Sequence, residues 1–281
     1  MKRFTRRMIA LIMTFALIVP TFAFAGCGPE RDSSKLYVGM ECGYAPFNYT
    51  QLDDANGAVK ISNAEGYANG YDVMIAKKIA EDMGKELVIV KYEWDALIPA
   101  IISGSLDFII AGMSPTDERK ESIAFSDAYY ESQLVVVVRK DGAYANAKSL
   151  SDLRGAKIVA QQGTFHDSAL QAQAGKYGIV ADTPIKTFPF MIYALNVKGV
   201  DGYVAEEPGA IADCSANPDF TYIPLINNQT GFEASAEDVQ IAIGMKKGSA
   251  NLQAINSALA KISASERLTL MQRATEYAVE D

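Results

Sequence analysis

The sequence predicts an α/β protein that is divided into two lobes. Strand-like and helix-like segments alternate from Leu36 onward, and a second series of the same kind follows the apolar segment 134–138. Such alternation is typical of parallel β-α-β units. With 281 residues, of which 49% are hydrophobic, the chain is long enough for two domains of about 100 residues each.

The first series begins with a strand and contains two helices with clear stop signals. The first helix places Ile79 and Met83 on one face and ends at Gly84, and the second ends at Gly104 after the cap residue Asp95. The expected elements are strands at 35–40, 86–93 and 106–112 and helices at 72–84 and 95–104.

The second series repeats this pattern after a capped turn at 149–155. Its expected elements are strands at 133–141, 157–161, 185–189 and 200–205 and helices at 164–178, 191–199 and 207–214.

The apolar segments 134–138 and 239–243 are expected to cross between the lobes, and two amphipathic helices near 249–262 and 264–278 are expected to return to the first lobe. The first lobe is therefore assigned to 36–133 plus 244–281, and the second to 134–243.

The N-terminal segment 1–26 has the layout of a secretory signal peptide: a basic start, an apolar middle at 8–25 and small residues before Cys27. The alternative is an uncleaved membrane anchor, but Pro20 interrupts an apolar segment of borderline length. The ending Ala25-Gly26-Cys27 resembles a bacterial lipobox, in which cleavage precedes a lipid-carrying cysteine. Residues 27–35 are then a polar, lipid-anchored linker.

The charge balance argues against a nucleic-acid partner. The formal net charge is -8, it becomes -12 when segment 1–26 is removed, and no basic run follows residue 7. Cys42 and Cys214 could pair in an exported chain, but they fall in different lobes and are expected to be free thiols. No Cys/His cluster has metal-ligand spacing and no nucleotide-binding motif occurs, so neither a metal nor a cofactor is expected.

The segment 109–130 predicts a site for a small carboxylate. A buried strand ends at Gly112, which allows close approach to the backbone. Ser114 is interpreted as a helix N-cap, so that free amides favour an anion. Arg119 adds a planar fork of donors suited to a carboxylate. The alternative is a surface arginine paired with an acid of the same helix, Asp117 or Glu121.

Other polar residues stand where strands end. Gly163 and Thr164 begin a helix in the second lobe, and the acids Glu41 and Glu206 each follow a strand. Ligands of open α/β sheets collect beyond the carboxyl ends of strands. Either acid could instead be a surface residue, and the nearby aromatics Tyr44, Phe47 and Trp94 could belong to the core.

Five stretches carry a pattern that is specific in combination: VGMECGYAPFNY, GYDVMIAKKIAEDMG, YEWDALIPAIISGSLDFIIAGMSPTDERKESIAFSDAYY, SLSDLRGAKIVAQQGT and VDGYVAEEPGAIA. Together they resemble the family 3 solute-binding proteins, the polar amino-acid receptors of ABC importers. The resemblance runs from Leu36 to the C-terminus. It implies a type II periplasmic-binding-protein-like fold, with a ligand cleft between lobes joined by two crossing strands.

The resemblance also implies a role for each site residue. Arg119 would hold the α-carboxylate, with Gly112, Ser114 and the amide of Thr164 beside it. Glu206 would hold the α-ammonium, where an aspartate is usual, and Phe165 replaces a small hydroxyl residue. Tyr44 and Trp94 would sandwich the side chain, and Glu41 would read its distal end.

The expected function is therefore an extracytoplasmic receptor for a polar amino acid. Glu41 favours lysine, arginine or ornithine, with glutamine as a further possibility. The receptor would deliver its ligand to an ABC permease with its ATPase, as a monomer anchored through a lipid on Cys27 to the outer face of the cell membrane, or in the periplasm. The alternative is an enzyme that resembles cyclohexadienyl dehydratase on the same scaffold, with Glu206 or His166 as general acid.

Overall fold

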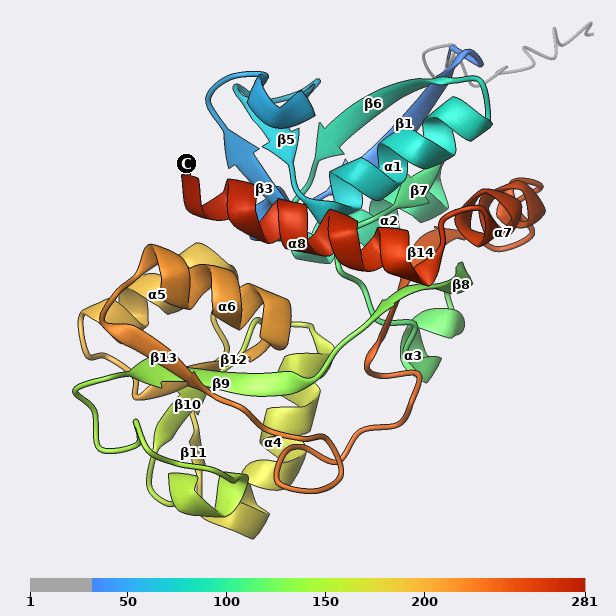
Figure 1. The fold of residues 1–281 in the computed structure, drawn as a ribbon. Helices are drawn as coiled ribbons and strands as arrows, with labels where there is room; N and C mark the ends of the chain where they lie inside the picture. Colours follow the sequence, from blue (N-terminus) through green and yellow to red (C-terminus); the bar gives the residue numbers. More distant parts are fainter. Residues whose placement is uncertain (1–31, 281) are drawn as a thin grey trace, which may run out of the picture. The chain divides into compact units, whose positions relative to one another are not determined.

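The computed structural model describes residues 32–280 (Figure 1). Residues from Ser33 onward form one compact unit. The expected signal peptide, Cys27 and most of the expected linker lie outside the described residues. Between residues 32 and 280, no helix combines the length and the apolar character that crossing a membrane requires.

The first of two five-stranded sheets contains β1 (Lys35–Met40), β6 (Glu86–Lys91), β7 (Phe108–Ile109), β8 (Ile123–Glu131) and β14 (Gln240–Lys246). Their order is β6-β1-β7-β14-β8. β1 pairs in parallel with β6 and β7, whereas β14 runs antiparallel to β7 and β8. The parallel pairs confirm the β-α-β units that the sequence predicts.

The helices of this lobe are α1 (Tyr71–Asp82), α2 (Trp94–Ser103), α3 (Asp117–Lys120), α7 (Leu252–Ala260) and α8 (Ala264–Glu280). α1 buries Ile79 on the face that the sequence predicts, with Ala76 buried beside it, and it contacts β6, α7 and α8. Both C-terminal helices pack on α1, and α8 also packs on α6 (Glu207–Ala216) of the second lobe (Figure 1).

A small antiparallel sheet lies beside the first one. It consists of β2 (Gly43–Tyr44), β3 (Asn48–Gln51), β5 (Tyr67–Asn69) and β4 (Val59–Lys60), with a 3-10 turn η1 (Ala55–Gly57). Buried Asn48 ties this sheet to its surroundings: its Oδ1 accepts from the Cys42 amide at 2.8 Å and its Nδ2 donates to Asp72 at 2.8 Å. This bonding fixes the segment that carries Glu41 and Tyr44.

The second five-stranded sheet contains β9 (Leu134–Arg139), β10 (Lys157–Val159), β11 (Val180–Ala181), β12 (Gly202–Glu206) and β13 (Phe220–Ile223) in the order β11-β10-β12-β9-β13. β10 pairs in parallel with β11 and β12, and β9 is antiparallel to β12 and β13. The helical elements are η2 (Leu150–Leu153), α4 (Phe165–Tyr177), α5 (Phe188–Asn196) and α6 (Glu207–Ala216).

The two segments expected to cross between lobes each belong to a single sheet. The chain leaves the first sheet after Glu131 and enters the second at Leu134, and it returns between Ile223 and Gln240. Because β9 and β14 are almost wholly buried, their apolar residues fill the cores of their own sheets. The chain therefore crosses between the lobes in the segments that precede β9 and β14, and not in these two strands.

Two local expectations also differ from the structure. The segment 185–189 was expected to be a strand, but Ile185 forms only a single bridge with Gln161 and α5 begins at Phe188. Helix α2 begins at Trp94 after Glu93, so Asp95 lies in its first turn rather than at its cap. The cysteines are both free thiols, with Cys42 buried and Cys214 half-buried.

Candidate functional site

One cavity gathers residues from both lobes. Eight of the nine predicted ligand-binding residues line it, all except Glu41, and about 10 Å³ of space remains between the side chains. Gln161 and His166 also line it; the sequence analysis did not name Gln161 and considered His166 only as a general acid of the alternative enzyme. The lining residues are Tyr44, Trp94, Gly112, Ser114, Arg119, Gln161, Thr164, Phe165, His166 and Glu206.

Arg119 is positioned by a helix of one turn, α3. The N-cap of α3 is Thr116, whose Oγ1 accepts from the Arg119 amide at 3.4 Å, so the expected cap at Ser114 is wrong. The chain is extended at Thr116 and turns helical only at Asp117, two residues later than expected. Ser114 instead positions the Arg119 side chain, because its carbonyl oxygen accepts a hydrogen bond from Arg119 Nη1 at 2.9 Å.

The Arg119 guanidinium contacts neutral groups of both lobes. Its Nη2 donates to the Gly163 carbonyl at 3.1 Å, and its Cζ lies 5.1 Å from the centroid of the Trp94 ring. Within residues 32–280, no carboxylate lies at ion-pair distance from it, so the alternative of a surface pair with Asp117 or Glu121 is not observed. Burial lowers the pKa of Arg119 to about 10. By accessible surface the side chain is half-buried, and a partly desolvated cation without an anionic partner favours binding of an anion.

Glu206 ends β12 and is buried directly before α6. Its Oε1 lies 2.9 Å from His166 Nε2, and the Tyr44 hydroxyl donates to its Oε2. Burial raises the pKa of Glu206 to about 8, and burial together with the nearby Arg119 charge lowers the pKa of His166 to about 3. The pair therefore favours its uncharged state near neutral pH.

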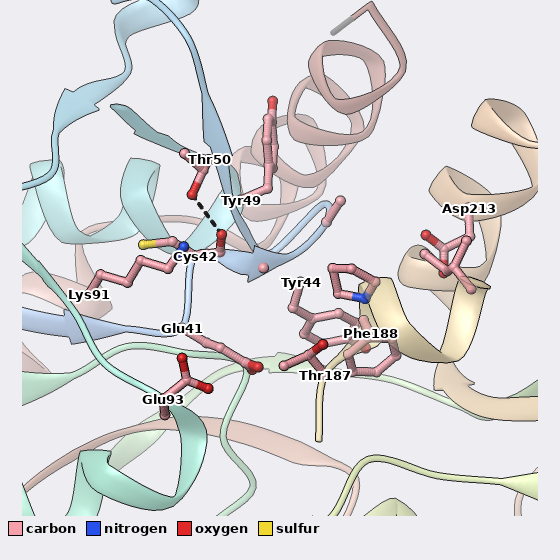
Figure 2. A pocket seen from close by; sticks show the side chains of 14 residues that line it. Glu41, Cys42, Tyr44, Tyr49, Thr50, Lys91, Glu93, Thr187, Phe188 and Asp213 are labelled. Atoms are coloured by element: carbon pink, nitrogen blue, oxygen red, sulfur yellow. Dashed lines mark hydrogen bonds between the residues drawn. The ribbon is translucent and has the colours of Figure 1, made fainter. Parts of the chain in front are cut away.

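Glu41 directly follows β1 and is only 6% exposed. Both of its carboxylate oxygens accept from Gln161 Nε2 at 2.9 Å, so the contact joins the two lobes. Burial raises the pKa of Glu41 to about 7. Glu41 lies outside the cavity described above and lines a neighbouring one, which also includes Tyr44 (Figure 2).

The aromatic residues are arranged differently from a Tyr44–Trp94 sandwich. The Tyr44 ring stacks on Phe188, with 3.9 Å between centroids, and on Phe47, with 5.1 Å. Trp94 lines the same cavity and donates its Nε1 to the Gly163 carbonyl at 3.0 Å. Phe188 is an aromatic neighbour that the sequence analysis missed, because it placed this residue in a strand.

The second-lobe wall approaches the first lobe closely at Gly163. This residue has φ +71°, and a Cβ added to it would lie 3.0 Å from Asp95 Oδ1. The positive φ favours glycine here, and a larger residue would also push the Asp95 carboxylate aside. The next residue, Thr164, is the N-cap of α4, as predicted, and its Oγ1 accepts from the Asp167 amide at 3.4 Å.

The match to a protein family decides what kind of protein this is. The family model of the bacterial extracellular solute-binding proteins, family 3, matches residues 36–274. The chain belongs to this family. Its members are extracytoplasmic, and the chain is a binding receptor and not an enzyme, as the sequence analysis expects.

Relatives of this family 3 protein cover nearly its whole length. The arginine-binding extracellular protein ArtP of Bacillus subtilis is 26% identical over 273 residues, which is 97% of each chain. The amino acid ABC transporter substrate-binding protein AbpA of Streptococcus pneumoniae, solved with L-arginine, has a TM-score of 0.72 and 26% identity over 88% of this chain and 97% of that one.

An ancestral arginine-binding protein has been solved with two ligands. Its arginine complex has a TM-score of 0.69 and 29% identity over 85% of this chain and 97% of that one. Its glutamine complex has the same TM-score and 27% identity over 86% and 98%. These neighbours confirm the two-lobed α/β fold of this family 3 protein.

Proposed function

We propose that this receptor binds a free α-amino acid with a cationic side chain, with arginine preferred over lysine and ornithine and with glutamine as the alternative ligand. One observation carries the proposal: Arg119 and Glu206 line the same cavity, and Glu41 lies at its border. A cation and two acids in this arrangement complement a carboxylate, an ammonium group and a distal cation.

The proposed ligand replaces contacts that the protein makes with itself. Its carboxylate takes the place of the Gly163 carbonyl on Arg119 Nη2. Its ammonium group takes the place of Tyr44 and His166 on Glu206. The distal group of the ligand binds Glu41, either together with Gln161 or in place of Gln161. Tyr44 and Trp94 would stack on the side chain once the Tyr44–Phe188 contact opens.

The names of the relatives support arginine over other amino acids. ArtP and AbpA are described as binding arginine, and the ancestral protein has been solved with arginine and with glutamine. A buried acid without a partner is costly, which favours ligands that bring a cation or a donor to Glu41. Glutamate and aspartate would place like charges together and should bind worst.

Delivery to a membrane permease with its ATPase is part of the same proposal. The receptor acts as a monomer that closes on its ligand and then docks. A lipid on Cys27 would keep it at the outer face of the cell membrane. Because one acyl chain binds a membrane only weakly, several chains are expected on that cysteine.

A thermal-shift panel of the twenty amino acids plus ornithine and cystine tests the ligand class. Ligands that bind the folded state raise the melting temperature, and the stabilisation grows with the logarithm of ligand concentration over Kd. The largest shifts should come from arginine, lysine and ornithine. If glutamate or a branched aliphatic amino acid gave the largest shift in melting temperature, the proposal would be contradicted.

A further inference from the structure

A second cavity of about 420 Å³ adjoins the amino-acid site (Figure 2). Its volume lies within the range of about 300–1,000 Å³ that is typical of small-molecule pockets. One wall comes from the first lobe, through Glu41, Thr50 and Glu93. The opposite wall comes from the start of α5, through Phe188 and Ile192. We refer to this cavity as the distal compartment.

The distal compartment borders the site at two residues. Tyr44 lines both cavities. Glu41 lines the distal compartment and is bonded to Gln161, which lines the site. In Figure 2 the Glu41 carboxylate points towards Thr187, across the compartment. A ligand anchored at Arg119, with its cation at Glu41, would therefore end at the border of this space.

The lining of the compartment suits a group that is both cationic and apolar. Glu41, Glu93 and Asp213 contribute three acids against the single base Lys91. On the α5 side the wall is apolar and consists of Phe188, Pro189 and Ile192. Unsubstituted arginine brings only the cation and would leave the apolar wall facing water, whereas hydrocarbon against that wall would be favourable.

We propose that the distal compartment receives an alkyl substituent on the distal nitrogen of the ligand. The receptor then accepts basic amino acids whose guanidinium or ammonium group carries such a substituent. The substituted nitrogen keeps its charge and an N–H for Glu41, while the alkyl group lies against Phe188 and Ile192. This inference rests on the proposed function, because it requires the ligand to be anchored at Arg119 and Glu206.

Calorimetry with L-arginine and Nω-propyl-L-arginine tests the proposal, since the two compounds share every anchoring group. The wild type should bind the propyl compound with an affinity equal to that for arginine or higher, allowing a difference of about threefold. If arginine binds and the propyl compound binds about a hundredfold more weakly, the proposed role of the distal compartment is wrong, while the proposed function still holds. Binding of neither compound would contradict the proposed function itself.

Two substitutions to tryptophan on α5 locate the substituent. Ile192→Trp fills the compartment and should weaken the propyl compound by at least about tenfold, with arginine changed by less than about threefold. Tyr193→Trp is the matched control, because Tyr193 is 63% exposed and lies outside the compartment. Should Ile192→Trp fail to fold, Thr50→Trp narrows the compartment from the first lobe. Equal loss for both compounds in the filled variant would overturn the proposal.

Discussion

His166 and Glu206 form a buried pair in which the imidazole Nε2 lies 2.9 Å from the carboxyl Oε1. The Tyr44 hydroxyl donates to the other oxygen, and Arg119 lines the same cavity. An ammonium ion can bind there strongly only when Glu206 is ionised, so ligand binding and proton release are linked.

Arginine binding should therefore release protons and strengthen as pH rises from 5 to 8. Burial raises the pKa of Glu206 to about 8 and that of Glu41 to about 7, so both acids hold protons in the free receptor below those values. A bound ammonium group and a bound guanidinium favour the two carboxylates, and each proton released adds up to about tenfold in affinity per pH unit.

Calorimetry at pH 6 in two buffers of different ionisation enthalpy measures this release. L-Glutamine is the matched ligand, since its neutral side chain does not require Glu41 to ionise, and it should release fewer protons than arginine. Heats that are independent of the buffer, with an affinity that is flat from pH 5 to 8, would contradict the linkage.

Arg119→Ala should abolish tight binding of every α-amino acid. Removing one partner of a buried ion pair costs about 3–5 kcal/mol, which is more than about a hundredfold in affinity. Arg273→Ala is the control, because Arg273 is an exposed arginine on α8. If calorimetry gave Arg119→Ala a Kd within threefold of wild type, Arg119 would not be a ligand-binding residue.

Ligand binding should change the fluorescence of Trp94, which is the only tryptophan of the chain. Its indole Nε1 donates to the Gly163 carbonyl across the lobes and its ring lies under Arg119, so both contacts change when a carboxylate reaches the guanidinium. An emission titration should give the same Kd as calorimetry. An unchanged spectrum at saturation would place Trp94 outside the ligand contacts.

Cys27→Ser should release the protein into the medium or leave it unprocessed. The expected lipid on Cys27 is the only membrane attachment in the proposal, and loss of the thiol prevents its addition. Fractionation of cells and mass spectrometry of the mature N-terminus check this. A wild-type N-terminus at another residue would refute the lipoprotein assignment.

The sequence predicts the site better than it predicts the peripheral strands. Glu206 ends β12 directly before α6, Thr164 caps α4, and Arg119 lies in the one-turn helix α3. All three belong to strand-to-helix connections, which the local pattern marks. β8, β11 and β13 were not predicted, nor was the small sheet that carries Tyr44. Three of its strands have two or three residues, too few for a periodic pattern, and β8 shows no regular alternation of burial.

The contacts made with the predicted site residues could not be read from the sequence. Gln161 contacts Glu41 from 120 positions away in the sequence, and His166 on α4 contacts Glu206 at the end of β12. Neither partner has a local signal, because a glutamine after a strand and a histidine in a first helical turn are ordinary residues there. Long-range packing alone brings them together.

Calorimetric titration of wild type and Glu41→Gln with L-arginine and L-glutamine tests the central claim most directly. The claim is that Glu41 selects a cationic side chain on an amino acid held by Arg119 and Glu206. Glu41→Gln should weaken arginine by at least about tenfold, or about 1.4 kcal/mol, and barely change glutamine. Glu65→Gln, an exposed loop acid, should change neither. An arginine affinity that Glu41→Gln leaves untouched, or a wild type that binds glutamate more tightly than arginine, would contradict the account.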